Sequence, residues 1–274
     1  MTQAENGQSG VLVTGAAGRV GRALRAIWGE NTANGLPLLW QSRDGGGPGG
    51  LAWDIGKNPP PVLPEGMIVL HLAGRTRGTP DDLAQNAAVT AAVCGAVRGG
   101  HVFVMSTAAV YAPGPDAIDE GVLPAPVSAY GVSKLAAERV ATEVLARRGA
   151  GLTILRLANL AGADALLGGV GPVVLDPVAG QAGGPVRSYI GPRVLAQVLA
   201  ALMQRPVAGV INVAQQPPVA MADLLEARGQ VWRFGPLRAG VVARVVLDTE
   251  RLAGLTDVPL TSAAALVADM ESLR

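Results

Sequence analysis

Tyr130 and Lys134 are the residues of this sequence whose types and spacing most directly suggest chemistry. They stand four residues apart in the segment Tyr-Gly-Val-Ser-Lys, and the chain has only one other lysine, Lys57. In a helix, two residues at this spacing share a face. An ammonium group beside a phenol stabilises the phenolate, which makes the tyrosine a candidate acid or base near neutral pH. An isolated copy of this pattern would more often be a solvated helix face, so its meaning depends on the rest of the chain.

A glycine-rich turn near the beginning of the sequence is a second candidate site. The segment Thr14-Gly15-Ala-Ala-Gly18-Arg-Val-Gly21 follows the apolar residues 11–13 and precedes a helically spaced apolar pattern at residues 22–28. A strand, a tight turn and a helix in this order suit the pyrophosphate of a dinucleotide, because glycines let the backbone approach it and the helix N-terminus offers free N–H groups. A plain glycine-rich connection is the alternative.

The elements that must position these groups alternate along the chain. Short runs rich in Val, Ile and Leu predict strands at residues 36–41, 67–72, 101–105, 153–157 and 210–213, and helices are predicted at residues 81–97, 128–148 and 194–203. Strands alternating with helices predict an α/β fold with a doubly wound parallel sheet, whose ligand lies at the carboxyl ends of the strands. Glycine- and proline-rich residues 44–50, 58–64 and 161–185 are predicted loops. The last of these is expected to be mobile and to contact substrate.

Composition limits the classes of function. The 274 residues can bury one sizeable core, and a net charge of +1 gives no reason to expect a nucleic acid or an acidic membrane surface as partner. No apolar run approaches the roughly 20 residues of a membrane span. Cys94 is the only cysteine and is expected to be buried rather than nucleophilic, and residues 1–10 lack the organisation of a signal peptide. We therefore expect a cytoplasmic protein. His71 and His101 form no metal-ligand cluster, so no metal is expected, and His71 is expected to serve packing.

Ten short motifs along the chain match one known family in order and spacing. They are Thr14-Gly15-Ala-Ala-Gly18-Arg-Val-Gly21, Trp53-Asp54-Ile55, His71-Leu-Ala-Gly74, Asn86, Ser106-Thr107-Ala-Ala-Val-Tyr111, Tyr130 with Lys134, Leu155-Arg156-Leu-Ala-Asn159, Arg187-Ser-Tyr189-Ile, Leu237-Arg238-Ala-Gly240 and Leu247-Asp248-Thr249-Glu-Arg251-Leu-Ala-Gly254. With these motifs the chain resembles the extended short-chain dehydrogenases/reductases, which include the nucleotide-sugar epimerases and dehydratases. The resemblance covers nearly the whole chain.

The resemblance implies a mechanism and a set of site residues. Tyr130 would exchange a proton with a substrate hydroxyl or carbonyl, Lys134 would hold the nicotinamide ribose and stabilise the tyrosinate, and Thr107 would hydrogen-bond the reacting oxygen. The cofactor-binding residues expected on this basis are Gly15, Ala17, Gly18, Arg19, Val20, Gly21, Arg43, Asp54, Ile55, Leu72, Ala73, Gly74, Asn86, Lys134 and Ala158. Two alternatives stay open: an ordinary strand-end hydroxyl for Thr107 and a helix-surface amide for Asn86.

The choice between NAD and NADP depends on the end of the second long strand. NAD enzymes of this fold usually carry an acid there that holds the adenine ribose. Trp40 and Gln41 stand near that position, and Arg43 together with Arg19 could pair with a 2′-phosphate. The cofactor is therefore NAD(P), with NADP favoured. Asp44 is the alternative ribose ligand if the strand ends later.

The substrate is only partly constrained. Ala108 and Ala109 stand where 4,6-dehydratases carry an acidic pair, and the Cys and His groups of family members that epimerise beside a carbonyl are missing, so simple oxidation or reduction and 4-epimerisation remain. The resemblance implies substrate contacts from Thr107, Asn159, Arg187, Tyr189 and Arg238. The two arginines favour an anionic substrate, with plain surface charge as the alternative. The short segment 159–187 suits a small one, such as a sugar, a uronic acid or another hydroxy/keto compound.

The resemblance also implies a domain organisation and an assembly. A Rossmann domain of residues 1–158, completed by residues 187–214, would carry the dinucleotide, and residues 159–186 and 215–274 would form a small C-terminal substrate lobe. Relatives often dimerise through the helices that correspond to residues 81–97 and 128–148, so a homodimer is expected. Three functions remain: an NAD(P)-dependent oxidoreductase acting on a sugar-like or hydroxy/keto substrate, a nucleotide-sugar 4-epimerase, and a non-catalytic dinucleotide-binding sensor.

Overall fold

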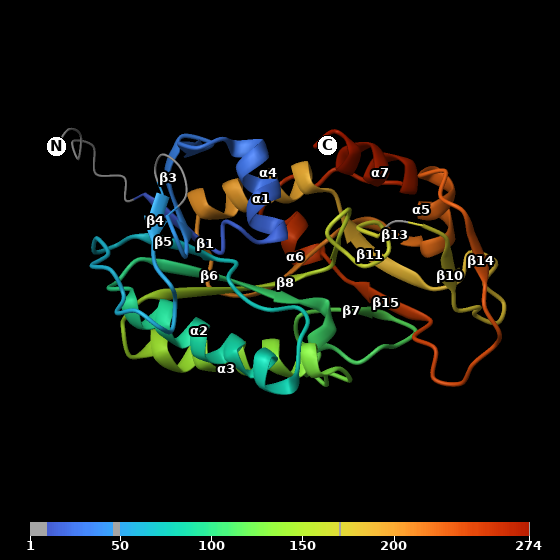
Figure 1. The fold of residues 1–274 in the computed structure, drawn as a ribbon, viewed down its shortest axis with the longest axis horizontal. Helices are drawn as coiled ribbons and strands as arrows, with labels where there is room; N and C mark the ends of the chain where they lie inside the picture. Colours follow the sequence, from blue (N-terminus) through green and yellow to red (C-terminus); the bar gives the residue numbers. More distant parts are fainter. Residues whose placement is uncertain (1–9, 46–49, 170, 274) are drawn as a thin grey trace. The chain divides into compact units, whose positions relative to one another are not determined.

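The structure is a computed structural model that describes residues 10–45, 50–169 and 171–273 (Figure 1). Its helices are α1 (Arg19–Trp28), α2 (Pro80–Ala96), η1 (Ala108–Val110), α3 (Ala129–Ala146), α4 (Pro192–Gln204), α5 (Met221–Ala227), α6 (Glu250–Ala253) and α7 (Ala263–Glu271). Its strands are β1 (Val11–Thr14), β2 (Thr32–Ala33), β3 (Leu36–Ser42), β4 (Gly50–Ala52), β5 (Ile68–His71), β6 (His101–Thr107), β7 (Ala117–Ile118), β8 (Gly151–Leu157), β9 (Asn159–Leu160), β10 (Val173–Leu175), β11 (Val186–Ile190), β12 (Gly209–Val213), β13 (Gln215–Ala220), β14 (Trp232–Phe234) and β15 (Arg244–Leu247). Some predictions fall on residues outside the described ones. They are the expectation that residues 1–10 are not a signal peptide, which concerns residues 1–9, and the predicted loops 44–50 and 161–185, which include residues 46–49 and 170.

The largest sheet has the strand order expected of a dinucleotide-binding fold. The order is β12-β8-β6-β5-β1-β3-β2, with β4 paired to β3. β1 runs parallel to both β3 and β5, and β5 runs parallel to β6. The chain leaves β1 toward β3 on one side and returns to β5 on the other, so the switch point lies between β1 and β5. The predicted doubly wound parallel α/β fold is confirmed.

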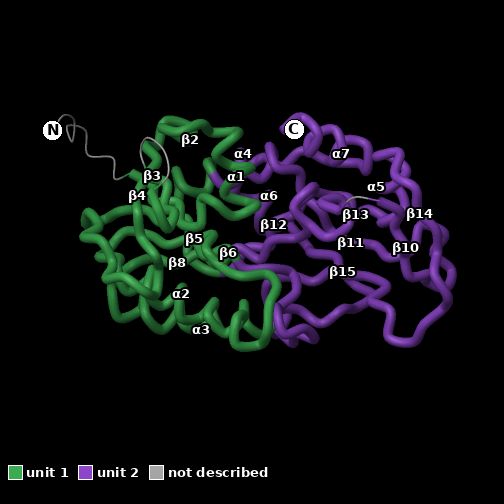
Figure 2. The backbone as a smooth tube through the Cα atoms, in the orientation of Figure 1, with its two compact units in different colours: residues 1–105, 132–154, 200–209 green, residues 106–131, 155–199, 210–274 purple. Residues whose placement is uncertain are grey.

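The chain divides into two compact units (Figure 2). The first comprises residues 1–105, 132–154 and 200–209, and the second comprises residues 106–131, 155–199 and 210–274. The predicted division into a Rossmann domain and a substrate lobe stays a prediction.

The first unit holds its sheet between helices, with α1 on one face and α2 and α3 on the other (Figure 1). Its core joins β1, β5 and β6 to the inward faces of α2 and α3 through buried side chains that include Leu12, Val69, Val104, Val93 and Leu145. Burying such apolar surface from both layers is what stabilises the α/β arrangement. The start of α2 is fixed by a capping box in which Thr79 Oγ1 accepts from the amide of Asp82 at 3.2 Å and the Asp82 carboxylate accepts in return from the amide of Thr79.

The second unit contains a sheet in the order β13-β11-β15-β7, in which β9 also pairs with β11, and the two-stranded pair β10-β14. Its core includes Leu175, Leu224, Leu225 and Leu266, so α5 and α7 pack together beside these strands. Sequence reasoning missed most of this unit. β13 contains Pro217 and Pro218, and the low strand propensity of proline argues against a strand there. β10 lies within a stretch that was predicted to be a loop.

The strands and helices predicted from periodicity are present within a few residues of the predicted bounds. The predicted helix at residues 81–97 is α2, and the helix expected after Ser128 is α3. Each helix in the part of the chain that the structure describes is too short or too polar to cross a lipid bilayer.

Candidate active site

Thr107 and Tyr130 come together in the second unit. Thr107 is the last residue of β6, and its Oγ1 accepts a hydrogen bond from the amide of Ala109 at 3.2 Å. The phenol of Tyr130, in the first turn of α3, shares a hydrogen bond with the Thr107 hydroxyl. A strand-end hydroxyl and a half-buried phenol therefore meet in one place, and their catalytic roles stay predictions.

Gly131 allows this approach, and sequence reasoning did not single it out. A Cβ atom at this position would overlap the carbonyl oxygen of Ala109 in η1, so the first turn of α3 lies directly against that segment. Ser128 Oγ accepts from the amide of Gly131 at 3.0 Å and satisfies one free N–H group of the helix start. The signal that could have found it was the glycine directly after the candidate tyrosine.

Lys134 follows Tyr130 by one helical turn of α3 and is buried. Burial lowers the pKa of its ammonium group to about 8, and the negative charge of the buried Glu138 opposes that shift. The pKa of Tyr130 is raised, because desolvation of the phenol outweighs the hydrogen bond from Thr107. The sequence-based expectation of a phenol whose pKa falls toward neutrality is therefore wrong for the protein alone, since desolvation is the largest influence on this group.

Because Lys134 is buried with a lowered pKa, its ammonium group makes the stability of the wild type depend on pH. Between pH 8 and 10.5 the unfolded chain still holds the proton that the folded protein has released, so wild-type stability rises with pH across this window. Lys134→Met removes this dependence, so the stability of the variant relative to wild type should fall by about 2–3 kcal/mol between pH 7 and pH 10.

Urea unfolding of both proteins at pH 7 and pH 10 measures this effect. Lys57→Met is the matched control, because the side chain of Lys57 is 76% exposed and its removal should change stability little at either pH. If the difference in free energy of unfolding between Lys134→Met and wild type is the same at both pH values, the lysine is not desolvated.

Asn86 links two segments of the first unit by hydrogen bonds. Its Oδ1 accepts from the amide of Arg75 at 2.7 Å, and its Nδ2 donates to the Arg75 carbonyl at 3.0 Å and to Ser133 Oγ at 3.0 Å. The side chain is buried, which excludes the surface-amide alternative. Both amide hydrogens are used within the protein, so Asn86 fixes the loop after β5 beside the residue that precedes Lys134.

The turn between β1 and α1 has the features that a dinucleotide pyrophosphate needs. Gly15 adopts a φ of 74°, and a Cβ atom there would lie 2.6 Å from the amide nitrogen of Ala73. The N-cap of α1 is Gly18, which supplies no side-chain cap, and the first turn of α1 contains no acidic residue. The start of α1 therefore presents the positive end of the helix dipole with no acidic side chain in its first turn, and the residues present fit the group.

Gln41 braces this turn, a role that sequence reasoning missed. Its Oε1 accepts from the amide of Gly15 at 2.8 Å, and its Nε2 donates to the carbonyl of Trp53 at 2.6 Å. The residue is buried at the end of β3, where the sequence analysis looked only for an acid. A buried amide can satisfy a donor and an acceptor at once, which neither an acid nor an apolar side chain does.

Gln41→Leu should therefore lower the free energy of unfolding by about 2–4 kcal/mol, because it leaves two backbone groups without partners. Urea unfolding measures the loss, and dinucleotide titration should show weaker binding because the turn is no longer held. Ser42→Ala is the control, since the Ser42 hydroxyl donates to the exposed Asp44 at 2.9 Å. Equal stability of the two variants would contradict the proposed brace.

The remaining predicted cofactor residues lie after β3 and β5, in or before α1, and, for Ala158, in the second unit. Arg43 is exposed just after β3, and Asp54 follows Trp53 and pairs with Lys57 at 3.3 Å. Leu72 and Ala73 are half-buried beyond β5. Ala17, Gly18 and Arg19 are exposed, Val20 and Ile55 are half-buried, Gly21 is buried, and Ala158 is buried in the second unit. Their contacts with a cofactor stay predictions.

His71 and Cys94 serve the interior of the first unit. His71 lies between Thr14 Oγ1 at 2.7 Å and Thr90 Oγ1 at 3.0 Å, and burial lowers its pKa to about 3, with the nearby Lys134 charge acting in the same direction. The histidine is therefore neutral at pH 7. Burial raises the pKa of Cys94 to about 12, which keeps the thiol protonated and unreactive. Among the described residues, no three His, Cys, Asp or Glu side chains are grouped so that they could hold a metal ion.

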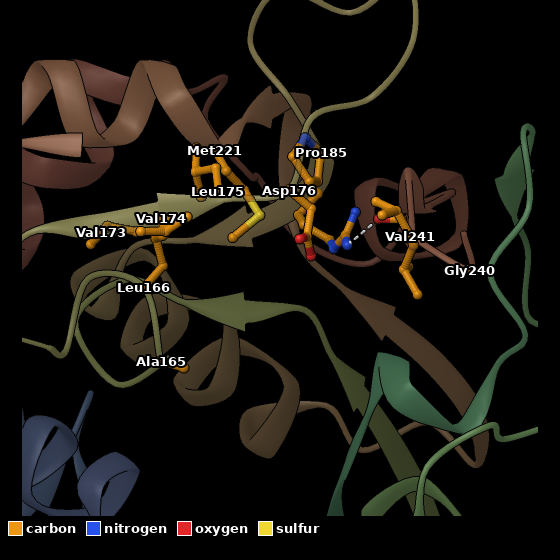
Figure 3. Close-up of a pocket in the computed structure, with 12 residues that line it drawn as sticks. Ala165, Leu166, Val173, Val174, Leu175, Asp176, Pro185, Met221, Gly240 and Val241 are labelled. Carbon is orange, nitrogen blue, oxygen red and sulfur yellow. Dashed lines mark hydrogen bonds between the residues drawn. The ribbon is translucent and has the colours of Figure 1, made fainter. Parts of the chain in front are cut away.

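The predicted substrate residues lie in the second unit, and most have partners within the protein. The hydroxyl of the buried Tyr189 donates to Asp164 at 2.7 Å, and Asn159 stands opposite Tyr189 in the β9–β11 pair. Arg187 lines a pocket of about 410 Å³ (Figure 3), and Arg238 forms an ion pair with Asp176 on its wall. Their roles toward a substrate stay predictions.

Comparison with known proteins identifies the family and the fold. The family model described as NAD dependent epimerase/dehydratase family matches residues 66–214. A search of curated proteins found no match.

Solved structures share the fold at low sequence identity. MoeE5 in complex with UDP-glucuronic acid and NAD has a TM-score of 0.77 and 21% identity, with 97% of this chain and 98% of that chain covered. UDP-glucose 4-epimerase from Thermus thermophilus with NAD has a TM-score of 0.73 and 20% identity, covering 96% and 98%. RMD from Pseudomonas aeruginosa with NADPH has a TM-score of 0.72 and 20% identity, covering 96% and 99%. The chain thus belongs to the NAD-dependent epimerase/dehydratase family of extended short-chain dehydrogenases/reductases and is an enzyme that uses a nicotinamide dinucleotide.

Proposed function

We propose that this enzyme is an NAD(P)-dependent oxidoreductase that acts on a sugar-like or hydroxy/keto substrate, with Tyr130 as the acid/base. The observation that carries the proposal is the hydrogen bond between Tyr130 and Thr107, one helical turn before the buried Lys134. A non-catalytic sensor would have no chemical use for this combination, and the family is one of enzymes.

Each residue has a defined task in the proposed reaction. When bound, the nicotinamide supplies the acceptor or donor of the hydride. Tyr130 takes the proton from the substrate hydroxyl during oxidation, or returns it to the carbonyl oxygen during reduction. Thr107 donates a hydrogen bond to that oxygen and keeps it against Tyr130. Lys134 favours the charged tyrosinate and holds the nicotinamide ribose.

The turn after β1 and the N-terminus of α1 would hold the cofactor pyrophosphate. Gly15 lets the backbone approach, Gln41 keeps the turn in place, and α1 offers the positive end of its dipole with no acidic residue in the first turn. We propose NADP as the preferred form, because Arg43 is exposed beyond β3, where a 2′-phosphate would need a cation, and Arg19 stands in the first turn of α1. The structures of MoeE5 and of the 4-epimerase contain NAD, which favours NAD as the alternative cofactor.

Paired titration with NADH and NADPH, followed by a screen of sugar acids and nucleotide sugars for a change in nicotinamide absorbance, tests the proposal. Energy transfer from tryptophan to the reduced nicotinamide reports binding. Binding of one form with turnover of a screened alcohol or ketone is the expected result. Binding of neither form would remove the basis of the proposed activity, and tighter binding of NADH would overturn only the cofactor preference.

The second candidate is nucleotide-sugar 4-epimerisation, which the 4-epimerases among the similar structures favour. An epimerase returns its cofactor unchanged, so net absorbance stays constant while the sugar changes configuration. NMR spectroscopy of the products from UDP-glucose or UDP-glucuronic acid separates the two reactions.

A homodimer built through α2 and α3 and a cytoplasmic location are further predictions of the family resemblance and of the single cysteine. Sedimentation analysis of the purified protein tests the first, with a mass of twice 27.7 kDa expected. Fractionation of cells that express the protein tests the second.

A further inference from the structure

The pocket in the second unit joins an apolar wall to charged groups (Figure 3). Leu166, Val173, Leu175 and Met221 form much of the apolar part. The volume of about 410 Å³ is within the range of small-molecule sites. The charged groups therefore decide which class of small molecule the pocket accepts.

Arg187 supplies a fixed positive charge in this pocket. Its two terminal nitrogens donate to the carbonyls of Val186 at 2.8 Å and Val242 at 2.6 Å, so the half-buried guanidinium is held against the wall. A guanidinium has five N–H donors, and these two bonds leave others for an anionic ligand.

Asp176 brings a negative charge to the same pocket. Its carboxylate lines the cavity, and one oxygen, Oδ1, accepts from Arg238 Nε at 3.0 Å and also contacts a terminal nitrogen of Arg238. The pair neutralises Arg238, so one uncompensated positive charge, that of Arg187, remains among these three groups. The Asp176 carboxylate would repel a ligand with several negative charges.

We propose that Asp176 sets the charge of the substrate and selects a compound with a single carboxylate, such as a hydroxy or keto acid of the sugar type, against one with a diphosphate. The proposal rests on the proposed function and names its substrate class. One carboxylate matches the single charge of Arg187. A diphosphate would need the Arg238 guanidinium as well, and that group is already in an ion pair with Asp176.

Dissociation constants for glucose, glucuronate and UDP, measured by calorimetry with saturating ADP-ribose to fill the pyrophosphate site after β1, test the proposal. Wild type should bind glucuronate more tightly than UDP. Asp176→Asn should raise UDP affinity about tenfold and glucuronate affinity about threefold, and should leave glucose unchanged, because both anions lose a repulsion and the diphosphate also gains the released Arg238 guanidinium. An exposed ion pair contributes little to folding, so this variant should fold normally.

Two further variants identify the cause. Asp257→Asn removes the same charge from an exposed position that does not line the pocket, and it should change each affinity less than twofold. Arg238→Ala, added to Asp176→Asn, should abolish most of the gain for UDP, since the gain requires the released guanidinium.

Several outcomes would overturn the proposal. They are a UDP affinity that is unchanged or lower in Asp176→Asn, an equal gain in Asp257→Asn, UDP binding that is undetectable in both wild type and Asp176→Asn, and tighter binding of UDP than of glucuronate by wild type. None of these measurements involves hydride transfer, so they can fail while the proposed oxidoreductase activity stands. The oxidoreductase activity is tested separately, by the loss of turnover expected for Tyr130→Phe.

Discussion

Tyr130→Phe is expected to lower kcat about 10³-fold while dinucleotide affinity stays within a factor of two, since positioned acid/base groups typically contribute 10²–10⁴-fold. The variant keeps the aromatic ring in the first turn of α3 and removes only the hydroxyl that meets Thr107. The proton of the reacting oxygen would then have no acceptor or donor in the protein. Steady-state turnover and cofactor titration of the same preparation measure the two effects.

Tyr111→Phe is the matched control for this prediction. Its hydroxyl is buried in the second unit, where it donates to Asn212 at 2.9 Å and accepts from Arg156 at 2.8 Å. Removing it should destabilise the fold by about 1–3 kcal/mol, because buried partners lose a hydrogen bond, with much less effect on kcat. Turnover by Tyr130→Phe close to the wild-type rate would exclude Tyr130 as the acid/base.

Gly15→Ala should nearly abolish dinucleotide binding and lower the free energy of unfolding by about 3 kcal/mol or more. The new Cβ would lie 2.6 Å from the Ala73 nitrogen and 2.7 Å from its Cα, and both are backbone atoms that cannot rotate away. A left-handed φ costs a non-glycine residue about 1–2 kcal/mol, and the overlap adds to that. The turn must move, and the backbone that approaches the pyrophosphate moves with it.

Gly29→Ala separates the two contributions. Gly29 has a φ of 75°, nearly that of Gly15, but a Cβ atom there would have no heavy atom within 4 Å among its surroundings. With a ψ of −161° it should show the conformational cost alone, about 1–3 kcal/mol, with normal cofactor affinity. Equal losses in the two variants, measured by urea unfolding and NADH titration, would show that contact with Ala73 does not matter.

Local pattern was enough to predict much of the first unit. The apolar runs of β1, β5 and β6 and the periodicity of α2 and α3 depend on neighbours in the sequence, and strand alternation with helices limits the topology to few arrangements. Gly15 and Gly18 could be assigned for the same reason, because a turn between strand and helix restricts the backbone locally. The second unit was less accessible, since β13 contains two prolines and strands such as β15 form by pairing with distant partners.

The sequence by itself therefore determined the family, the dinucleotide-binding fold and the candidate chemistry of Tyr130 and Lys134. Tertiary structure alone decided that Gln41 braces Gly15, that Asn86 links Arg75 to Ser133 and that Asp176 neutralises Arg238, a residue 62 positions away. It also decided that burial raises the pKa of Tyr130. Spacing along the chain specifies which side chains share a helix or strand, whereas hydrogen bonds between distant segments and the loss of water depend on which surfaces meet when the chain folds.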